Sequence, residues 1–480
     1  MNMPFSHAGV RAMTLPCDWV ETSGGGLPLG LQLVGSYGGD ERLLALAARM
    51  GSSPMPSPPS HRQHRIPSFL RHVGPGVVTG AADDDPSGIA TYTQAGAQFG
   101  TGVLWTVFLT LPFMIGIQLV SARIGRQSGQ GIAANLRLHT PRLFLYFIVA
   151  LLLVANTVNI AADISAMGEA LQLVVGGGDH FHAVAFGVIT LLLQVFVPYR
   201  RLAPILKWLT LALFVYVAAA FTVHIPWAQV LHDLVVPSMV PSSAFWMMIV
   251  AILGTTISPY LFFWQAAQEV EEMRLHGITA GAESAHTLRR AKRRMRLDTV
   301  IGMLFSNGVA FFVMLMGAVV LHASGVTDVQ SAAQAAQALR PLAGDFAFLL
   351  FSFGIIATGL LAVPVLASSA AYAVAEAFGW PEGLERHWRE AKGFYAIIAI
   401  ATIVGTGLDF TPVDPMKALY WSAVINGVVA VPIMVAMMLL AAKPAVMGPL
   451  PVRRKTRALG WGAVALMTTA VAMMGWDMVR

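Results

Sequence analysis

The chain has 480 residues, of which 56% are hydrophobic and only 12% are charged, and its formal net charge is +6. Soluble domains carry about 25% charged residues, so this composition excludes a soluble protein. The high apolar fraction excludes a disordered chain, and the single cysteine, Cys17, excludes a disulfide-stapled fold. We therefore expect a protein that crosses a membrane several times.

Residues 1–50 differ from the rest of the chain. They are moderately polar and include the run SGGGLPLGLQLVGSYGGDERLLALAARM, which resembles the carboxyl-terminal stretch of amidase-signature hydrolases. The catalytic serines and lysine of that family have no counterpart here, and an isolated strand and helix cannot bury a core. We interpret residues 1–50 as a non-functional amidase-like remnant, followed by a linker over 51–65 and a transmembrane domain over 66–480.

Eleven stretches of the chain are apolar over about the 20 residues that a membrane-spanning helix needs. They lie near residues 70–99, 101–122, 143–172, 183–199, 204–224, 244–272, 297–322, 342–376, 392–410, 415–442 and 457–478. The sequence therefore predicts an all-α membrane protein with about 11 transmembrane helices in a lipid bilayer.

The basic residues predict how these spans are oriented, because Lys and Arg accumulate in cytoplasmic loops. With the amino terminus inside, 25 of them fall on the cytoplasmic side, and only Arg340, Lys417 and Arg480 fall on the other. The dense basic run over 289–296 is then a cytoplasmic anchor, and without an aromatic platform beside it we expect no nucleic-acid binding. We predict a multi-pass protein of the cell (cytoplasmic) membrane, with the amino terminus in the cytoplasm and the carboxyl terminus outside.

Two of the spans contain residues that break a helix. The first is interrupted by DDDPSG, residues 83–88, and the sixth by GTTISPY, residues 254–260. Three carboxylates at membrane depth cost roughly 2.5 kcal/mol or more each if ionised, and unwound backbone is tolerated there only where it faces protein or a cavity. Because the breaks occupy corresponding positions of two five-span halves, they predict inverted repeats with a transporter's binding site between them.

Polar residues continue from the breaks along single helix faces. Gln94 follows the first break, Gln265 follows the second, and Asn159 with Asp163 marks the third span at the spacing of one helix turn. Asp163 is a lone carboxylate within a span, which makes it a functional candidate. The structural alternative is an acceptor of a hydrogen bond from a neighbouring helix.

The stretch GPGVVTGAADDDPSGIATYTQAGAQFG, residues 74–100, resembles the Nramp family of proton-coupled divalent-metal transporters. That family carries an Asp-Pro-Gly-Asn break before a similar Gln-Ala-Gly-Ala-Gln-Phe-Gly run. ILGTTISPY resembles its Met-Pro-His break, and DPMKALYWSAVINGVV its tenth span. The resemblance extends from about residue 66 to 478. It implies the LeuT fold, with inverted five-helix repeats, broken first and sixth helices, alternating access, no enzyme activity and no cofactor.

The resemblance also implies a metal site at the two breaks. Asp85 matches the family's metal-binding aspartate, and Thr255 the position whose carbonyl binds metal. Gly88 stands in place of a metal-binding asparagine, Ser258 in place of the metal-selecting methionine, and Asp84 is expected to add charge. Further residues complete the breaks and line the cavity: Pro86, Ser87, Pro259 and Tyr260 at the breaks, and Gln94, Gln265, Asn159 and Asn426 in the cavity wall.

The same comparison leaves few groups for proton coupling. Asp163 matches a carboxylate of the family's proton path, but Ala166 replaces its partner glutamate and Gln265 replaces a histidine. Asp163 and Asp83 are therefore the predicted proton pathway. Weak or missing coupling is the open alternative.

The departures from the family pattern predict the cargo. A thioether is a soft ligand, whereas Ser258 leaves carboxylate, hydroxyl and carbonyl oxygens that suit Mg²⁺ or Mn²⁺ better than late transition metals. We expect secondary active transport of one of these cations. The alternatives are a LeuT-fold permease for another small solute such as an amino acid, a membrane-anchored amidase, which would need the missing catalytic residues, and a non-transporting sensor.

Overall fold

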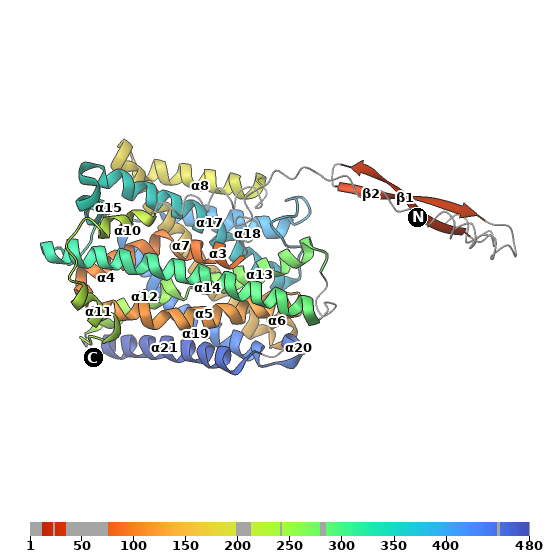
Figure 1. Cartoon of the computed structure of the whole chain (residues 1–480). Coiled ribbons are helices and arrows are strands. Elements are labelled where there is room, and N and C mark those ends of the chain that lie inside the picture. The colour runs from red at the N-terminus through yellow and green to blue at the C-terminus, as the bar shows by residue number, and fades with distance from the viewer. Residues whose placement is uncertain are drawn as a thin grey trace. The chain divides into compact units, whose positions relative to one another are not determined.

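The computed structural model describes the following parts of the chain: residues 12–22, 25–34, 75–197, 213–240, 242–278, 285–448 and 452–479. The chain divides into two compact units, Met1–His72 and Val73–Arg480. In the first unit, strands β1 (Ala12–Thr22) and β2 (Gly25–Val34) pair as an antiparallel sheet (Figure 1). The proposed amidase-like origin and linker stay predictions.

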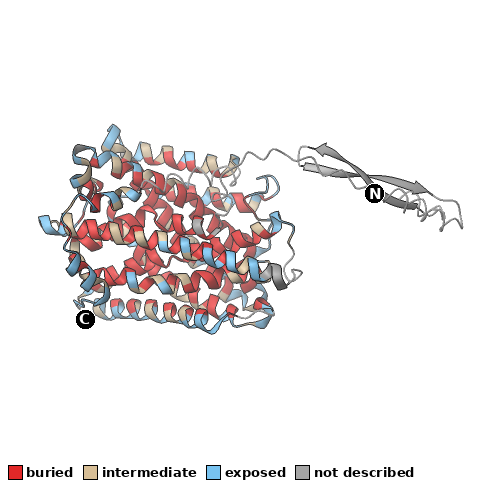
Figure 2. Ribbon diagram, in the orientation of Figure 1, coloured by how far each residue is buried: buried red, intermediate tan, exposed pale blue. Residues whose placement is uncertain are grey.

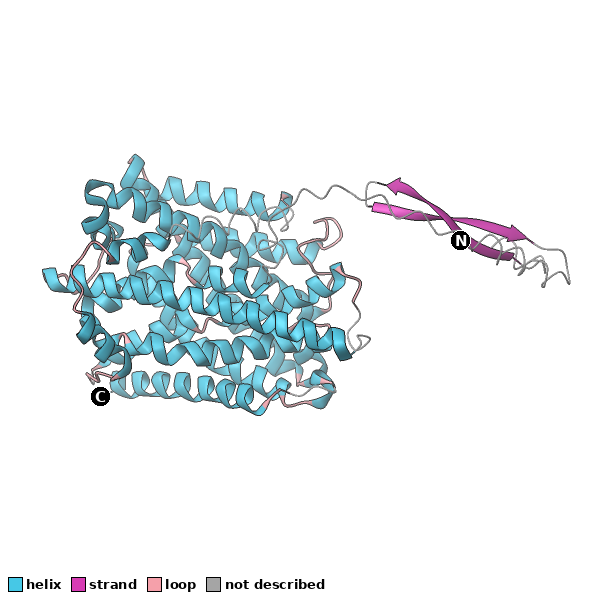
Figure 3. Cartoon of the chain, in the orientation of Figure 1, coloured by secondary structure: helices cyan, strands magenta, loops and turns pink. Residues whose placement is uncertain are grey.

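In the described residues of the second unit, helices joined by loops are the regular secondary structure (Figure 3). Its first span consists of two half-helices, α3 (Pro75–Asp83) and α4 (Pro86–Phe99), and its sixth of α12 (Ser243–Thr256) and α13 (Pro259–Leu275). The other helices, in chain order, are α5 (Trp105–Ser128), α6 (Ile132–His139), α7 (Arg142–Val175), α8 (Asp179–Phe196), α10 (Phe214–Ala220), α11 (Trp227–Val235), α14 (Ala285–Met316), α15 (Ala332–Ala336), α16 (Arg340–Ala343), α17 (Ala347–Phe378), α18 (Lys392–Leu408), α19 (Pro415–Ala441), α20 (Pro444–Met447) and α21 (Arg454–Val479).

The predicted fold class is confirmed. Among the described residues, seven helices are long and apolar enough to span a membrane, and the broken sixth span is one of them. Shorter apolar helices fill the predicted fourth and ninth spans. Of the predicted fifth span, α10 is described, and residues 204–212 lie outside the described part of the chain. The short helices α6, α11, α15 and α20 were not predicted from the sequence.

The helices pack in two groups. Helices α3, α4, α5, α12, α13 and α14 contact one another, and so do α7, α8, α17 and α18. These are spans one, two, six and seven in the first group, and three, four, eight and nine in the second. Corresponding members of the two five-span halves therefore share a group, as inverted repeats require. We call these the break-helix group and the α7 group.

Burial follows the contacts between helices (Figure 2). The helix faces that meet are buried, whereas large apolar side chains such as Phe108, Leu143 and Ile403 are exposed on the outside of the unit. An apolar exterior of this kind suits a bilayer rather than water. Small residues allow the closest approaches: a Cβ built on Gly80 of α3 would lie 2.2 Å from the carbonyl oxygen of Gly302 in α14.

Candidate functional site

The first break is a direct result of local sequence. Helix α3 ends at Asp83, and α4 begins at Pro86, whose ring fits the first helical position but cannot continue a helix from before. Asp85 is extended (φ −71°, ψ 171°) and caps α4 by accepting a hydrogen bond from the Gly88 N–H at 2.8 Å. The positive end of α4 is therefore already occupied by a carboxylate of the chain itself.

The second break also has a polar residue directly before a proline, but this residue, a serine, does not cap the helix that follows with its side chain. Helix α13 begins at Pro259, and Ser258 before it is extended. The Ser258 hydroxyl faces backward and lies 2.7 Å from the Thr255 carbonyl oxygen and 3.1 Å from that of Gly254. It therefore hydrogen-bonds to carbonyls that the interrupted helix α12 leaves without a backbone donor.

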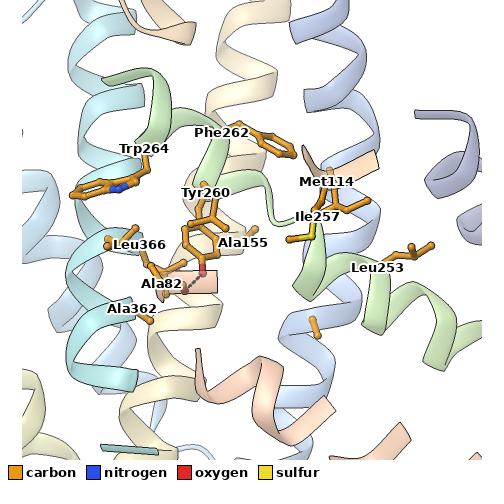
Figure 4. Close-up of a cluster of buried hydrophobic side chains, with 14 of the residues drawn as sticks. Ala82, Met114, Ala155, Leu253, Ile257, Tyr260, Phe262, Trp264, Ala362 and Leu366 are labelled. Atoms are coloured by element: carbon orange, nitrogen blue, oxygen red, sulfur yellow. Dashed lines mark hydrogen bonds between the residues drawn. The ribbon is translucent and has the colours of Figure 1, made fainter. Parts of the chain in front are cut away.

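Tyr260 joins the two breaks. From the first turn of α13 it reaches α3, where its hydroxyl donates to the Ala82 carbonyl oxygen at 2.8 Å (Figure 4). The ring lies in a cluster of apolar side chains that includes Ile257 and Leu366. Its hydroxyl is also 3.5 Å from Asp85 Oδ2. Tyr260, which the sequence predicted only as part of a break, therefore contacts Asp85, the predicted metal ligand.

Asp85 lies where three helices meet. It accepts hydrogen bonds from the Ser87 hydroxyl at 2.7 Å and from the Asn159 amide of α7 at 3.0 Å, and it is only 2% exposed. Asp163, one turn further along α7, is fully buried beside the backbone N–H of Ser87. The structure therefore brings together Asp85, Asn159, Tyr260 and Asp163, all of which the sequence had marked.

Asp83 and Asp84 face a different helix. Both lie at the hydroxyl of Ser306 in α14, at 2.6 Å from Asp83 Oδ2 and 3.2 Å from Asp84 Oδ1. One hydroxyl donates one hydrogen bond, so it can satisfy only one of these carboxyl groups at a time. Among the described residues no three His, Cys, Asp or Glu side chains converge to hold a metal ion, because the three consecutive aspartates do not point to one place.

Several buried polar atoms around the breaks have no hydrogen-bond partner among the described residues. They belong to side chains of the first break and of α4, α7, α12 and α19: Asp83, Asp84, Tyr92, Asn159, Asp163, Thr255 and Asn426. Buried polar groups in proteins are nearly always satisfied, and exceptions need an explanation such as a ligand. Oxygen atoms dominate this set, so it suits a hydrated cation.

The other predicted residues take different places. Gly88 offers no side chain, and a Cβ there would lie 3.0 Å from the Thr255 hydroxyl oxygen. Gln94 accepts a hydrogen bond from the Val329 N–H at 2.7 Å, so it holds the segment before α15. Gln265 accepts one from the Thr79 hydroxyl at 2.5 Å, on the α3 side of the break.

Two residues at the site were missed by the sequence analysis. Ser306 lies within an apolar span, and its only signal was the polar pair that it forms with Asn307. Tyr92 is fully buried two turns after Asp85, with a ring edge that would touch a Cβ on Gly88 at 3.4 Å. Its pattern is that of an ordinary core aromatic residue.

A family model described as natural resistance-associated macrophage protein-like (Nramp) matches residues 76–477.

The chain belongs to the Nramp family.

Two proteins of Klebsiella pneumoniae, each named divalent metal cation transporter MntH, are 28% identical over 419 residues, which are 85% of this chain and 94% of theirs. The family prediction is therefore confirmed. Nramp proteins are transporters, so the prediction that this chain is not an enzyme stands with it.

Solved structures agree on the fold. The manganese transporter of Eremococcus coleocola, in complex with an aromatic bis-isothiourea compound, matches with a TM-score of 0.65 at 18% identity, over 84% of this chain and 86% of that one. A variant of the same transporter also gives 0.65, at 19% identity and over 87% and 88% of the two chains. This Nramp chain therefore has the LeuT fold that the family resemblance implied.

Proposed function

We propose that this Nramp chain carries a divalent metal cation across a membrane by alternating access, and that the cargo is a hard cation, Mn²⁺ or Mg²⁺. The observation that carries the proposal is the surroundings of Asp85. Its side chain contacts the hydroxyls of Ser87 and Tyr260 and the amide nitrogen of Asn159, whose own Oδ1 has no hydrogen-bond partner among the described residues. The groups left for a cation here are therefore oxygen atoms, the ligand that hard cations prefer. The names of the Klebsiella relatives support the general class of cargo.

The charges at the first break also favour a cation over the amino-acid alternative. A substrate carboxylate would use the positive end of a half-helix, but Asp85 already occupies that end of α4. Asp83 and Asp84 add further acidic groups within the same break. An anionic substrate would meet like charges in a medium of low dielectric constant, which costs several kcal/mol by simple Coulomb estimates.

Alternating access is supported by burial. Asp85, Thr255 and Ser258 are each no more than 2% exposed, so a cation reaches them only if the helices move. The two helix groups provide parts that can move against one another, because the site lies between α4 and α13 of one group and α7 of the other. We assign Asp85, the Thr255 carbonyl and Ser258 to the metal, with Asp84 and Gly88 beside it, and Asp163 and Asp83 to the proton.

For the membrane we propose the cell membrane, with the amino terminus in the cytoplasm and the carboxyl terminus outside. The support is the distribution of Lys and Arg, of which 25 of 31 fall on the assigned inner side. In this orientation the end of α13 near Leu275 faces the cytoplasm, and the segment before α15 faces the outside.

The test is uptake by purified protein in liposomes. Mn²⁺ and Mg²⁺ should enter, Cd²⁺ should compete poorly, and Asp85→Ala should reduce uptake to the level of empty liposomes. Asp414→Ala is the matched control, because Asp414 also precedes a proline and caps a helix, accepting from the Met416 N–H at 2.9 Å, but is exposed. Unchanged uptake in Asp85→Ala, or no uptake of either cation by the unmodified protein, would refute the proposal.

A further inference from the structure

A column of polar side chains leads away from the first break through the interior of the break-helix group. The Thr79 hydroxyl of α3 donates to Gln265 Oε1 at 2.5 Å, and the Gln265 amide donates to Glu269 Oε1 at 3.4 Å. Gln265, Glu269 and Glu272 are spaced four and three residues apart, which places them on one face of α13. The column therefore continues along this face beyond Glu269.

Both ends of the column reach places where a cation or proton can be exchanged. Asp83 is one helix turn from Thr79 in α3, so the Thr79 end of the column lies next to the first break. At the other end, Glu272 pairs with Arg294 at 3.3 Å, and its side chain is 23% exposed. Glu269 is thus a buried titratable group between the break and the surface that we assign to the cytoplasm.

Glu269 lies buried among other charged groups. Those close enough to act on its charge are Arg126 of α5, Asp298 of α14 and its own neighbour Glu272, and α3 contributes the Thr79 hydroxyl through Gln265. Glu269 is 3% exposed, Asp298 6% and Arg126 8%. A charged carboxylate buried to this degree is costly, and a proton bound to Glu269 removes that charge.

Glu269 and the residues around it all belong to the break-helix group. Thr79, Arg126, Gln265 and Asp298 lie on α3, α5, α13 and α14, the break-helix group. Asp298 also accepts a hydrogen bond from the Gly76 N–H at 2.6 Å, which attaches the start of α3 to α14. When the two groups rock against each other, the cluster can therefore travel intact with its proton.

We propose that Glu269 is a proton-binding site of this transporter. While a cation is taken up, a proton entering at the first break forms an O–H bond with the Glu269 carboxylate. That bond breaks when water beside Glu272 accepts the proton on the cytoplasmic side. This site rests on the proposed transport function, and it differs from Asp163, which lies on α7 in the other helix group.

The experiment measures Mn²⁺ uptake and internal pH together in liposomes that contain the full chain. Glu269→Gln should keep Mn²⁺ binding within about twofold by calorimetry, while proton entry per Mn²⁺ falls to background and uptake loses its dependence on external pH. Glu269→Asp should restore part of the proton entry. Glu376→Gln should stay coupled, because Glu376 is also a buried glutamate but lies on α17 of the other group, where it accepts a hydrogen bond from the Ala134 N–H at 3.0 Å.

Three results would overturn the assignment and leave metal transport standing. The first is proton entry at the unmodified ratio in Glu269→Gln. The second is loss of proton entry in Asp163→Asn but not in Glu269→Gln. The third is Mn²⁺ uptake by the unmodified protein with no proton entry. If no metal moves at all, the proposed function fails separately. The infrared absorption of protonated carboxyl groups in the metal-free protein then tests whether Glu269 binds a proton. The Glu269 band should vanish in Glu269→Gln but not in Glu272→Gln. Its persistence in Glu269→Gln refutes the site.

Discussion

The contact between α13 and α17 gives the sharpest test of alternating access. The Tyr372 hydroxyl of α17 donates a short hydrogen bond to Glu271 of α13, which also accepts from the Leu384 N–H at 2.8 Å. Helices α13 and α17 belong to different groups, so we expect these bonds to break when the groups separate at this end. Tyr372→Phe removes the phenol and keeps the ring that packs on Phe394.

The size of the effect follows from the bonds that are lost. A hydrogen bond to a charged group contributes about 1.5–3 kcal/mol, and each 1.4 kcal/mol is a factor of ten in an equilibrium. Because the Leu384 N–H remains on Glu271, the carboxylate is not left without a partner. We therefore expect Tyr372→Phe to shift the equilibrium toward the open arrangement by about tenfold, the lower end of that range.

The assay measures the distance across the contact by pulsed electron spin resonance. Cysteines replace two exposed residues on opposite sides, His276 after α13 and Glu390 before α18, in a Cys17→Ser background that has no other cysteine. In the unmodified protein the short-distance population should dominate. In Tyr372→Phe a longer-distance population should grow, and uptake should change with it.

Tyr395→Phe is the matched control. The Tyr395 hydroxyl donates to the Arg386 carbonyl oxygen at 3.0 Å, and both residues follow α17 on the same side of the contact. This variant also loses one phenol but should leave the distances unchanged. Identical distance distributions in Tyr372→Phe and the unmodified protein would show that the bond to Glu271 does not close this end.

Two further predictions concern stability and pH. Gly80→Ala should destabilise the fold by about 1–3 kcal/mol and so lower the thermal unfolding midpoint, because its Cβ would lie 2.2 Å from the Gly302 carbonyl oxygen. Gly354→Ala is the control, because a Cβ at Gly354 meets open space and should leave the midpoint unchanged. Equal midpoints in the two variants would contradict the close packing of α3 on α14. Burial raises the pKa of Glu382, after α17, although Arg274 lies 3.3 Å away. The closed arrangement then binds this proton more tightly than an exposed glutamate, with a pKa near 4.3, would. Closure should therefore strengthen as the pH falls from the raised pKa toward 4.3 and weaken as it rises, and Glu382→Gln should remove this dependence in the same distance measurement.

The helix breaks were predictable because their causes are local. An aspartate or serine that caps a helix, followed at once by a proline, interrupts the backbone hydrogen-bond ladder whatever surrounds it. The structure places Asp85 in this capping role, whereas Ser258 stands at the same position before α13 with its hydroxyl bonded back to the Thr255 carbonyl oxygen. Apolar length likewise predicted the spans, because the bilayer imposes it on every helix that crosses.

The directions of the side chains were not predictable in this way. Three consecutive aspartates looked like one charged cluster, yet Asp85 meets Asn159 of α7 while Asp83 and Asp84 meet Ser306 of α14. Nothing in an apolar span marks Ser306 as the partner of residues more than 200 positions earlier. Gln94, predicted to line the cavity, holds the segment before α15.

Local chemistry therefore determined that this chain spans a membrane, breaks two helices and concentrates carboxyl groups at one of them. Which oxygen atoms face one another was decided only by the packing of helices that are distant in sequence. Glu269 shows the difference most clearly. In the sequence it is one of several acidic residues near the end of a span, and only the folded chain buries it beside Gln265, within reach of the charges of Arg126 and Asp298. Contacts of this kind depend on how whole helices approach one another, which no short stretch of sequence specifies.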